Sequence, residues 1–329
     1  MTWDRQWPLK PDLVLEGGNV AKDALGAVWT PDLSLLTTYH KTADALLTTA
    51  NATSASTALA TRMAAQVMAE YPSLWPETVR GLLVHSAAWT DRMRAQFLPA
   101  EPSKLDYLRL VRRCGFGEPD LERALWTLKN SLTLVLQETI TPFQRGSSKQ
   151  PALKELNVHD LPWPRETLEA LLDTTVEMKV TLSYFIEPNP STRGVRSRYR
   201  YASHGLRFDV KRPTESPSKF RKRINVAARE EDEEAPDSPQ DASWLLGPRG
   251  RHRGSLHCDI WRGKAADLAS RETLAVYPSI GWWKSRPHLE RVDKTARYAL
   301  LVTLHVPDVE VDLYTEVANQ IGVQVPFGL

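Results

Sequence analysis

The feature that most constrains the fold is a change of hydrophobic period near residue 130. Residues 1–129 are rich in Ala, Leu and Thr, and their apolar residues recur at helical spacing. Residues 130–212 and 255–329 instead contain runs such as Val176–Ile186, in which apolar and polar residues alternate as in β-strands. A single uniform architecture is therefore excluded. We expect a mostly helical segment followed by a strand-rich one.

The composition is that of an ordinary globular protein. Lys and Arg number 42 against 40 Asp and Glu, a formal charge of +2, and 42% of the 329 residues are hydrophobic. That length suits roughly two domains, and the near-zero charge excludes the overall basic field of a general nucleic-acid binder. The sequence has no membrane-spanning apolar run and no signal-peptide core at its start. We expect a soluble, cytoplasmic protein, although a missing N-terminal signal would change that location.

The first 129 residues predict one short strand and several helices. Leu13–Leu15 precedes a glycine turn at Gly17 and Gly18 and is interpreted as a buried strand. From Thr53 onward the spacing of Ala, Leu, Met and Val predicts a buried helix of about 17 residues. Further helices are expected at about residues 77–89, 104–113 and 119–125.

Four segments of this region have a characteristic order and spacing. They are Lys10-Pro-Asp-Leu-Val-Leu-Glu-Gly-Gly18, Asn51-Ala-Thr-Ser-Ala-Ser-Thr-Ala58, Pro76-Glu-Thr-Val-Arg-Gly-Leu-Leu-Val-His-Ser-Ala87 and Gly115-Phe-Gly-Glu-Pro-Asp120. The set resembles the subtilases, the subtilisin-like serine proteases, in which KPDxxAPG precedes the nucleophile motif GTSxAxP and a GxGxxD segment follows. The resemblance covers about residues 9–128. It implies that residues 1–129 are the C-terminal part of a parallel-sheet α/β catalytic domain.

The resemblance places Ser54 at the nucleophile position, where the long helix begins. A serine hydroxyl in a first helical turn is exposed on one side, and unpaired backbone N–H groups beside it can stabilise an oxyanion. The family role therefore implies peptide-bond hydrolysis through an acyl-enzyme on Ser54. The residues by themselves leave a second interpretation open, in which Ser54 only caps the helix.

The other members of the subtilase site are absent from their family positions. The family's Asp, His and oxyanion Asn lie far upstream of the Ser, whereas only 53 residues precede Ser54 and none of them forms a D-[ST]-G motif. His40 lacks the Gly that follows the family's histidine, and His204 comes after the Ser. His85 is interpreted as a helix-face residue, and Asn19 is too close to Ser54 in sequence to be the oxyanion Asn.

Two substitutions within the nucleophile motif also depart from the family. Ala52 stands where the motif has Gly, and Ala58 where it has Pro. Because a serine without a positioned base is a poor nucleophile, we expect the chain alone to be nearly inactive as a protease. The simplest hypothesis is that it is the C-terminal part of a longer subtilase. A truncated sheet and uncovered helix faces would then make the isolated chain prone to aggregation.

The second half predicts an accessory domain. Its strand candidates are Ser131–Glu138, Val176–Ile186, Gly205–Lys211, Gly254–Ile260, Ala275–Val276, Arg297–Val306 and Val309–Tyr314. Six or seven short strands with polar loops indicate an antiparallel β-sandwich over residues 130–329, a type of domain that many subtilases carry after the protease. A charged, flexible insert is expected at about residues 213–253, where a basic stretch meets the acidic run Glu230–Glu234.

The remaining motifs predict few ligands. Trp282 and Trp283 lie beside basic residues, a combination that can bind nucleic acid, but these rings can equally cover the core of the sandwich. No RNA- or DNA-binding signature occurs, so nucleic acid is not expected. Cys114 and Cys258 form no CxxC pair and are interpreted as buried thiols. Phosphate-loop and metal motifs are absent, so no cofactor and no metal site are predicted.

The leading hypothesis is therefore the C-terminal part of a serine endopeptidase with an incomplete triad. The expected partners are a protein or peptide substrate and an N-terminal half or companion protein that supplies the rest of the triad. The alternative is a non-catalytic module that binds protein or nucleic acid.

Overall fold

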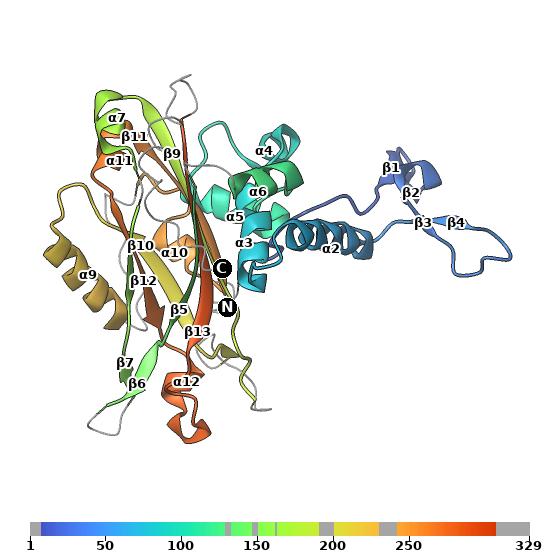
Figure 1. Cartoon of the computed structure of the whole chain (residues 1–329). Helices are drawn as coiled ribbons and strands as arrows, with labels where there is room; N and C mark the ends of the chain where they lie inside the picture. Colours follow the sequence, from blue (N-terminus) through green and yellow to red (C-terminus); the bar gives the residue numbers. More distant parts are fainter. Residues whose placement is uncertain are drawn as a thin grey trace.

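The computed structural model describes residues 8–128, 133–146, 151–161, 163–190, 201–229 and 242–306. These residues form a mixture of α-helices and antiparallel sheets (Figure 1), so the mixed α and β character is confirmed. Every strand pair in the described ranges is antiparallel. The parallel sheet implied by the resemblance therefore stays a prediction.

An N-terminal arm, residues 19–50, projects from the rest of the molecule (Figure 1). It contains two hairpins and a short 3₁₀ helix: β1 (Val20–Asp23), β2 (Gly26–Trp29), η1 (Pro31–Leu33), β3 (Leu35–Thr38) and β4 (Leu47–Ala50). The long helix α2 (Thr53–Glu70) follows, which confirms the helix predicted from Thr53. The expectation that this helix is buried is wrong, because Val67 is the one buried residue of α2. Leu13–Leu15 does not form the expected strand, because no described strand pairs with it. Its backbone is joined to Gly117 through the Val14 N–H, at 3.1 Å.

Four further helices make up a helical unit. They are α3 (Pro76–Ser86), α4 (Asp91–Phe97), α5 (Lys104–Cys114) and α6 (Leu121–Thr127). Proline begins α3 where a missing N–H is tolerated, and a capping box between Ser103 and Asp106 begins α5. The three predicted helices are confirmed. Helix α4 was not predicted, because it has seven residues and none of them is buried.

A main sheet of four strands lies beside the helical unit, in the order β11-β9-β13-β5 (Figure 1). Its strands are β5 (Thr133–Ile140), β9 (Thr175–Tyr184), β11 (Leu256–Lys264) and β13 (Ala296–His305). Successive side chains of β13 point to opposite faces of the sheet. Leu300 therefore packs in a large core shared with the second sheet, whereas Ala299 and Leu301 pack with the helices. Helix α3 crosses this face closely at Gly81, where a Cβ atom would lie 2.7 Å from Leu301 Cδ1.

A second sheet, β10-β12-β8, shares the large core with the main sheet. It consists of β8 (Asn157–Asp160), β10 (Gly205–Val210) and β12 (Thr273–Ser279), and α9 (Pro217–Arg229) covers its other face (Figure 1). The smaller elements are β6 (Phe143–Arg145), β7 (Pro151–Leu153), α7 (Arg165–Ala170), α10 (Gly247–Arg251), α11 (Ala265–Ala269), α12 (Trp282–Ser285) and η3 (Pro287–Leu289). The two sheets are antiparallel, as expected. Their assignment as a β-sandwich domain with a boundary at residue 130 stays a prediction.

Part of the insert that we expected to be flexible is helical. Phe220, Ile224 and Ala228 recur at helical spacing in α9 and bury one face of it against Ala275 and Tyr277 of β12. An otherwise polar segment is thereby ordered, and α10 lies near the end of the same insert. The acidic residues 230–241 and the strand candidate Val309–Tyr314 lie outside the described residues.

Candidate functional site

Ser54 lies in the first turn of α2, exposed to solvent, four residues after the end of β4. The helix begins after Ala52, which has an extended backbone (φ −163°) and no side chain that could cap the first turn. The backbone N–H groups of Thr53 and Ser54 therefore find no acceptor among the described residues. Ser54 thus combines an exposed hydroxyl with two free amides beside it.

The start of α2 is held by the segment that precedes the arm. Ser56 donates its hydroxyl to the carbonyl oxygens of Leu15 at 2.9 Å and Glu16 at 3.1 Å. The two residues that follow Glu16 are Gly17 and Gly18, and a side chain at either position would be unfavourable. A Cβ on Gly17 would lie 2.7 Å from Ser56 Oγ, and Gly18 has a φ of +90° with Asn51 against it. Residues 17 and 18 do not form the turn expected from the two glycines. The close contacts of Gly17 and the left-handed backbone of Gly18 instead hold the chain against the first turn that carries Ser54.

The arm next to this turn exposes an unusual amount of apolar surface. Leu25 is 97% and Leu46 is 73% exposed. Other large apolar side chains of the arm are also exposed, namely Val20, Val28, Trp29, Leu33, Leu36 and Leu47. Two-stranded hairpins are marginally stable in water, and clustered exposed apolar residues are typical of interaction surfaces. The arm therefore has the character of a surface that another polypeptide covers.

None of the eight histidines hydrogen bonds to Ser54, and all eight lie within the described residues. His40 is exposed on the arm with its ring at the edge of Tyr39. His85 is buried between Thr181 and Thr303, 2.9 and 2.7 Å from their hydroxyls. His204 is buried against Trp283, and burial lowers its pKa to about 3. The described part of the chain thus provides Ser54 with no base.

The tryptophan pair lies in the core rather than on the surface. Trp282 and Trp283 are 1% and 6% exposed, and both indole N–H groups donate to Glu187. Their rings are therefore covered and not exposed for stacking on nucleotide bases. The basic residues 193–200 lie outside the described residues.

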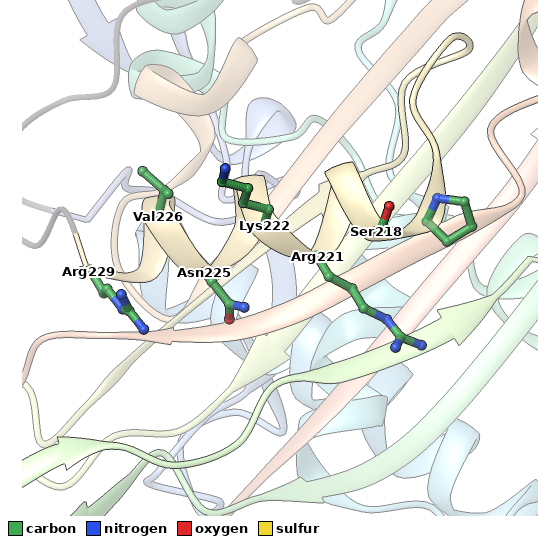
Figure 2. A pocket seen from close by; sticks show the side chains of 7 residues that line it. Ser218, Arg221, Lys222, Asn225, Val226 and Arg229 are labelled. Atoms are coloured by element: carbon green, nitrogen blue, oxygen red, sulfur yellow. The ribbon is translucent and has the colours of Figure 1, made fainter.

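A shallow hollow follows the outer face of α9. In Figure 2 Arg221, Asn225 and Arg229 point to one side of the helix and Lys222 and Val226 to the other. This face lies opposite the side chains that bury against β12. The polar groups do not converge on a common point, so the hollow has the character of a solvated surface.

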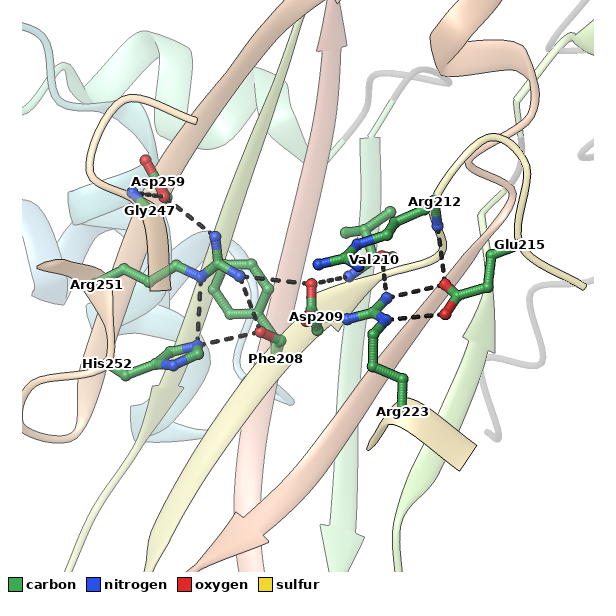
Figure 3. Close-up of polar contacts among 10 residues, drawn as sticks. All are labelled: Phe208, Asp209, Val210, Arg212, Glu215, Arg223, Gly247, Arg251, His252 and Asp259. Atoms are coloured by element: carbon green, nitrogen blue, oxygen red, sulfur yellow. Dashed lines mark hydrogen bonds and ion pairs between the residues drawn. The ribbon is translucent and has the colours of Figure 1, made fainter. Parts of the chain in front are cut away.

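Figure 3 shows a network of buried and half-buried ion pairs around Arg251 and Arg223. The Arg251 guanidinium contacts the Asp259 carboxylate at 3.3 Å, and both side chains are fully buried. Two aromatic rings, Phe208 and Trp244, lie 4.4 and 4.5 Å from the guanidinium carbon. Every charge in this centre has a partner, so it is a structural connection between α10 and the strands.

No cluster of three or more potential metal ligands occurs among the described residues. Within the same ranges, no helix has both the length and the apolar character needed to cross a membrane. The two cysteines are buried and unpaired, and burial raises the pKa of each thiol.

Residues 1–117 match the model of the subtilase family. The predicted resemblance is therefore confirmed for this part of the chain, which contains the arm, α2, α3, α4 and α5. An uncharacterized protein, y4bN, of Sinorhizobium fredii (strain NBRC 101917 / NGR234) is 30% identical over 227 residues. The alignment covers 66% of this chain and 47% of that protein, so the chain spans about half the length of the relative it matches.

Proposed function

We propose that residues 1–129 are the nucleophile-bearing part of a subtilisin-like serine endopeptidase. Ser54 is the nucleophile, and the Asp, the His and the oxyanion Asn come from a polypeptide segment outside this chain. The observation that carries the proposal is the exposed Ser54 hydroxyl in the first turn of an 18-residue helix, within the segment that matches the subtilase family. In this proposal the Leu13–Leu15 segment becomes a strand of a parallel sheet once the missing neighbours are present.

The chemistry follows from the position of the hydroxyl. Ser54 Oγ attacks the peptide carbonyl carbon while the supplied His takes its proton, and that proton then passes to the leaving amine. The free amides at the start of α2 are donors that can stabilise the oxyanion in this proposal. Water hydrolyses the acyl-enzyme. Because the described histidines all lie elsewhere, the chain alone retains only a small residual rate, about 10⁶-fold below that of a complete triad.

The exposed apolar surface of the arm is evidence that a partner polypeptide binds beside Ser54. It is continuous in sequence with α2, and Asn51 at the helix start donates to the carbonyl oxygen of Asn19 at 2.5 Å. A polypeptide that covers the arm therefore lies next to the hydroxyl. We propose that this polypeptide is the complementary subtilase half and that the substrate is a protein or peptide. The two antiparallel sheets, residues 130–329, are proposed to be an accessory β-sandwich.

Covalent labelling tests the proposal. The chain is co-expressed with a subtilase N-terminal half that carries the missing Asp, His and Asn, and the mixture is treated with a fluorophosphonate probe. We expect labelling of the wild-type chain at Ser54, located by peptide mass spectrometry, and none of Ser54→Ala. Ser56→Ala is the matched control two residues further along, because its hydroxyl is already bonded to backbone carbonyls. Equal labelling of wild type and Ser54→Ala would contradict the assignment.

A non-catalytic binding module is the second candidate. The absence of any base near Ser54 among the described residues and the exposed apolar arm favour it. In this case no chain is labelled, and partner binding is the same for wild type and Ser54→Ala. Loss of binding on replacing arm residues such as Leu25 and Leu46 by Ser would then identify the arm as the interface.

A further inference from the structure

A cavity of about 910 Å³ lies between the helical unit and the main sheet, away from Ser54. Helices α3 and α6 form one side of it, and strands β9, β11 and β13 form the other. Its volume falls within the range of ordinary small-molecule sites, roughly 300–1,000 Å³. Neither the subtilase resemblance nor the sequence motifs assign a role to it.

The walls of the cavity are largely apolar. Trp89 and Phe116 line it from the helical side, and Leu246, Ile260 and Leu304 line it from the sheet side. Such walls favour the apolar body of a ligand over water. The charged groups on the helical side are Arg94, Asp120, Glu122 and Arg123. A second set of polar groups lies on the sheet side, where neighbouring strands meet α3.

Lys179 of β9 is the cation among these polar groups. Its ammonium donates one hydrogen bond, to the carbonyl oxygen of Ala87 at 2.8 Å. The two remaining N–H groups have no acceptor among the described residues, and no described carboxylate forms an ion pair with the ammonium. Burial lowers the pKa of Lys179, as expected for an ammonium with incomplete compensation. A cation that is removed from bulk water in a protein normally has an anionic partner.

The neighbours of Lys179 cannot provide the missing negative charge. His85 is held between two threonine hydroxyls, and burial lowers its pKa, so it is neutral near pH 7. Thr181 donates to Cys258 Sγ at 3.3 Å, and burial raises the pKa of that thiol, which also remains neutral.

The carboxylates that line the cavity already have other partners. Asp259 pairs with Arg251, Asp120 pairs with Arg123, and Glu177 pairs with Arg262. Glu122 lies exposed on α6 at the edge of the cavity, together with the exposed Arg94 and His305. Among the described lining residues, Lys179 and the exposed Arg94 are thus the Lys and Arg side chains without a carboxylate in contact, and Lys179 is the one on the sheet side.

We propose that this cavity binds a small apolar monocarboxylate whose carboxylate pairs with Lys179. The ligand's apolar body lies against Trp89 and Phe116, and its oxygens take the two free N–H groups of the ammonium. The site is independent of Ser54 and of the proposed protease activity.

Isothermal titration calorimetry of the full-length chain with 4-phenylbutyrate tests this site. The neutral 4-phenylbutan-1-ol, with the same apolar body, is titrated in parallel. We expect the carboxylate to bind at least about 10-fold more tightly than the alcohol, the size of effect given by a charge-assisted hydrogen bond. Equal affinity for the two compounds, or no binding of either at about 10 mM, would overturn the proposal.

Two variants locate the effect. Lys179→Met removes the charge and keeps most of the stem, and we expect the preference for the carboxylate to fall to about one. The matched control is Lys264→Met on neighbouring β11, because Lys264 pairs with exposed Asp173 away from the cavity, and it should keep the wild-type preference. A preference retained in folded Lys179→Met overturns the site. Because Lys179→Met can fail to fold, Lys179→Arg is a second variant, and it should retain the preference. Ser54→Ala should bind as wild type does.

Discussion

The buried contact between Arg251 and Asp259 provides a sharp test of the packing between α10 and β11. Asp259 accepts hydrogen bonds from the backbone N–H groups of Leu246, Gly247 and Ile260, at 2.9, 3.0 and 2.9 Å. The guanidinium of Arg251 is the fourth hydrogen-bond donor to the Asp259 carboxylate. Burial raises the pKa of Asp259 even so. Replacing Asp259 by Asn removes the nearer negative charge and leaves the fully buried Arg251 with Asp209, at 3.7 Å, as its remaining carboxylate contact among the described residues.

We expect Asp259→Asn to lower the free energy of unfolding by about 3–5 kcal/mol, the cost of breaking a buried ion pair from one side. Arg251→Met should cost less. The carboxylate of Asp259 then keeps three backbone donors, and the Met side chain still fills the space between Phe208 and Trp244. The expected order of stability is therefore wild type, Arg251→Met and then Asp259→Asn.

Urea unfolding followed by circular dichroism measures these free energies by linear extrapolation. Glu177→Gln is the control, because its partner Arg262 is 60% exposed, and surface pairs contribute about 1 kcal/mol or less. An Asp259→Asn variant as stable as Glu177→Gln would refute the reasoning. So would an Arg251→Met variant that is the less stable of the two.

Two further predictions concern buried titratable groups. The pKa of His204 is about 3 in the folded protein and about 6.5 when unfolded. Only the unfolded state binds the proton between these values, so this residue lowers the unfolding free energy by about 1.4 kcal/mol per pH unit as pH falls. Urea titrations at several pH values should show a smaller dependence for His204→Phe, and an unchanged slope would contradict this. Cys114 and Cys258 are buried with raised pKa values. Ellman's reagent at pH 8 should therefore detect both thiols in urea and neither promptly in the native chain, and rapid native reaction would refute the packing around them.

The elements that could be predicted from the sequence are those with a strong local period. Helix α2 and strands β9 and β13 follow directly from the spacing of their apolar residues, and only their ends shift by one or two positions. The Leu13–Leu15 strand was wrong because a strand needs a neighbour, and no local pattern states whether one is present. Helix α9 has apolar residues at helical spacing, but the many charged residues around them led to the prediction of a flexible insert.

Of the two candidate sites, one could be predicted from a local sequence pattern and the other could not. Ser54 could be predicted because its motif is local and resembles a family. The environment of Lys179 could not, because Ala87 is 92 positions away in the sequence, and the contact exists only once α3 lies on the main sheet. Polar residues at alternate positions of an otherwise apolar strand, here Lys179, Thr181 and Ser183, were the one available signal.

The family resemblance suggests two things about this chain: that its helices are left uncovered, and that a companion polypeptide is missing. The packing of α3 shows that these two suggestions are independent. If the helices of residues 1–129 needed a parallel sheet to cover them, their apolar faces would be exposed in this chain. Instead Val79 and Leu82 of α3 are buried against Ala299 and Leu301 of β13, so the antiparallel sheet covers the helical unit. The exposed apolar surface is concentrated in the arm. Helices α3–α6 and the two sheets therefore have a core of their own. We expect the companion proposed above to cover the arm and the exposed part of α2, where Val67 is the one buried residue, and we expect any aggregation to begin there.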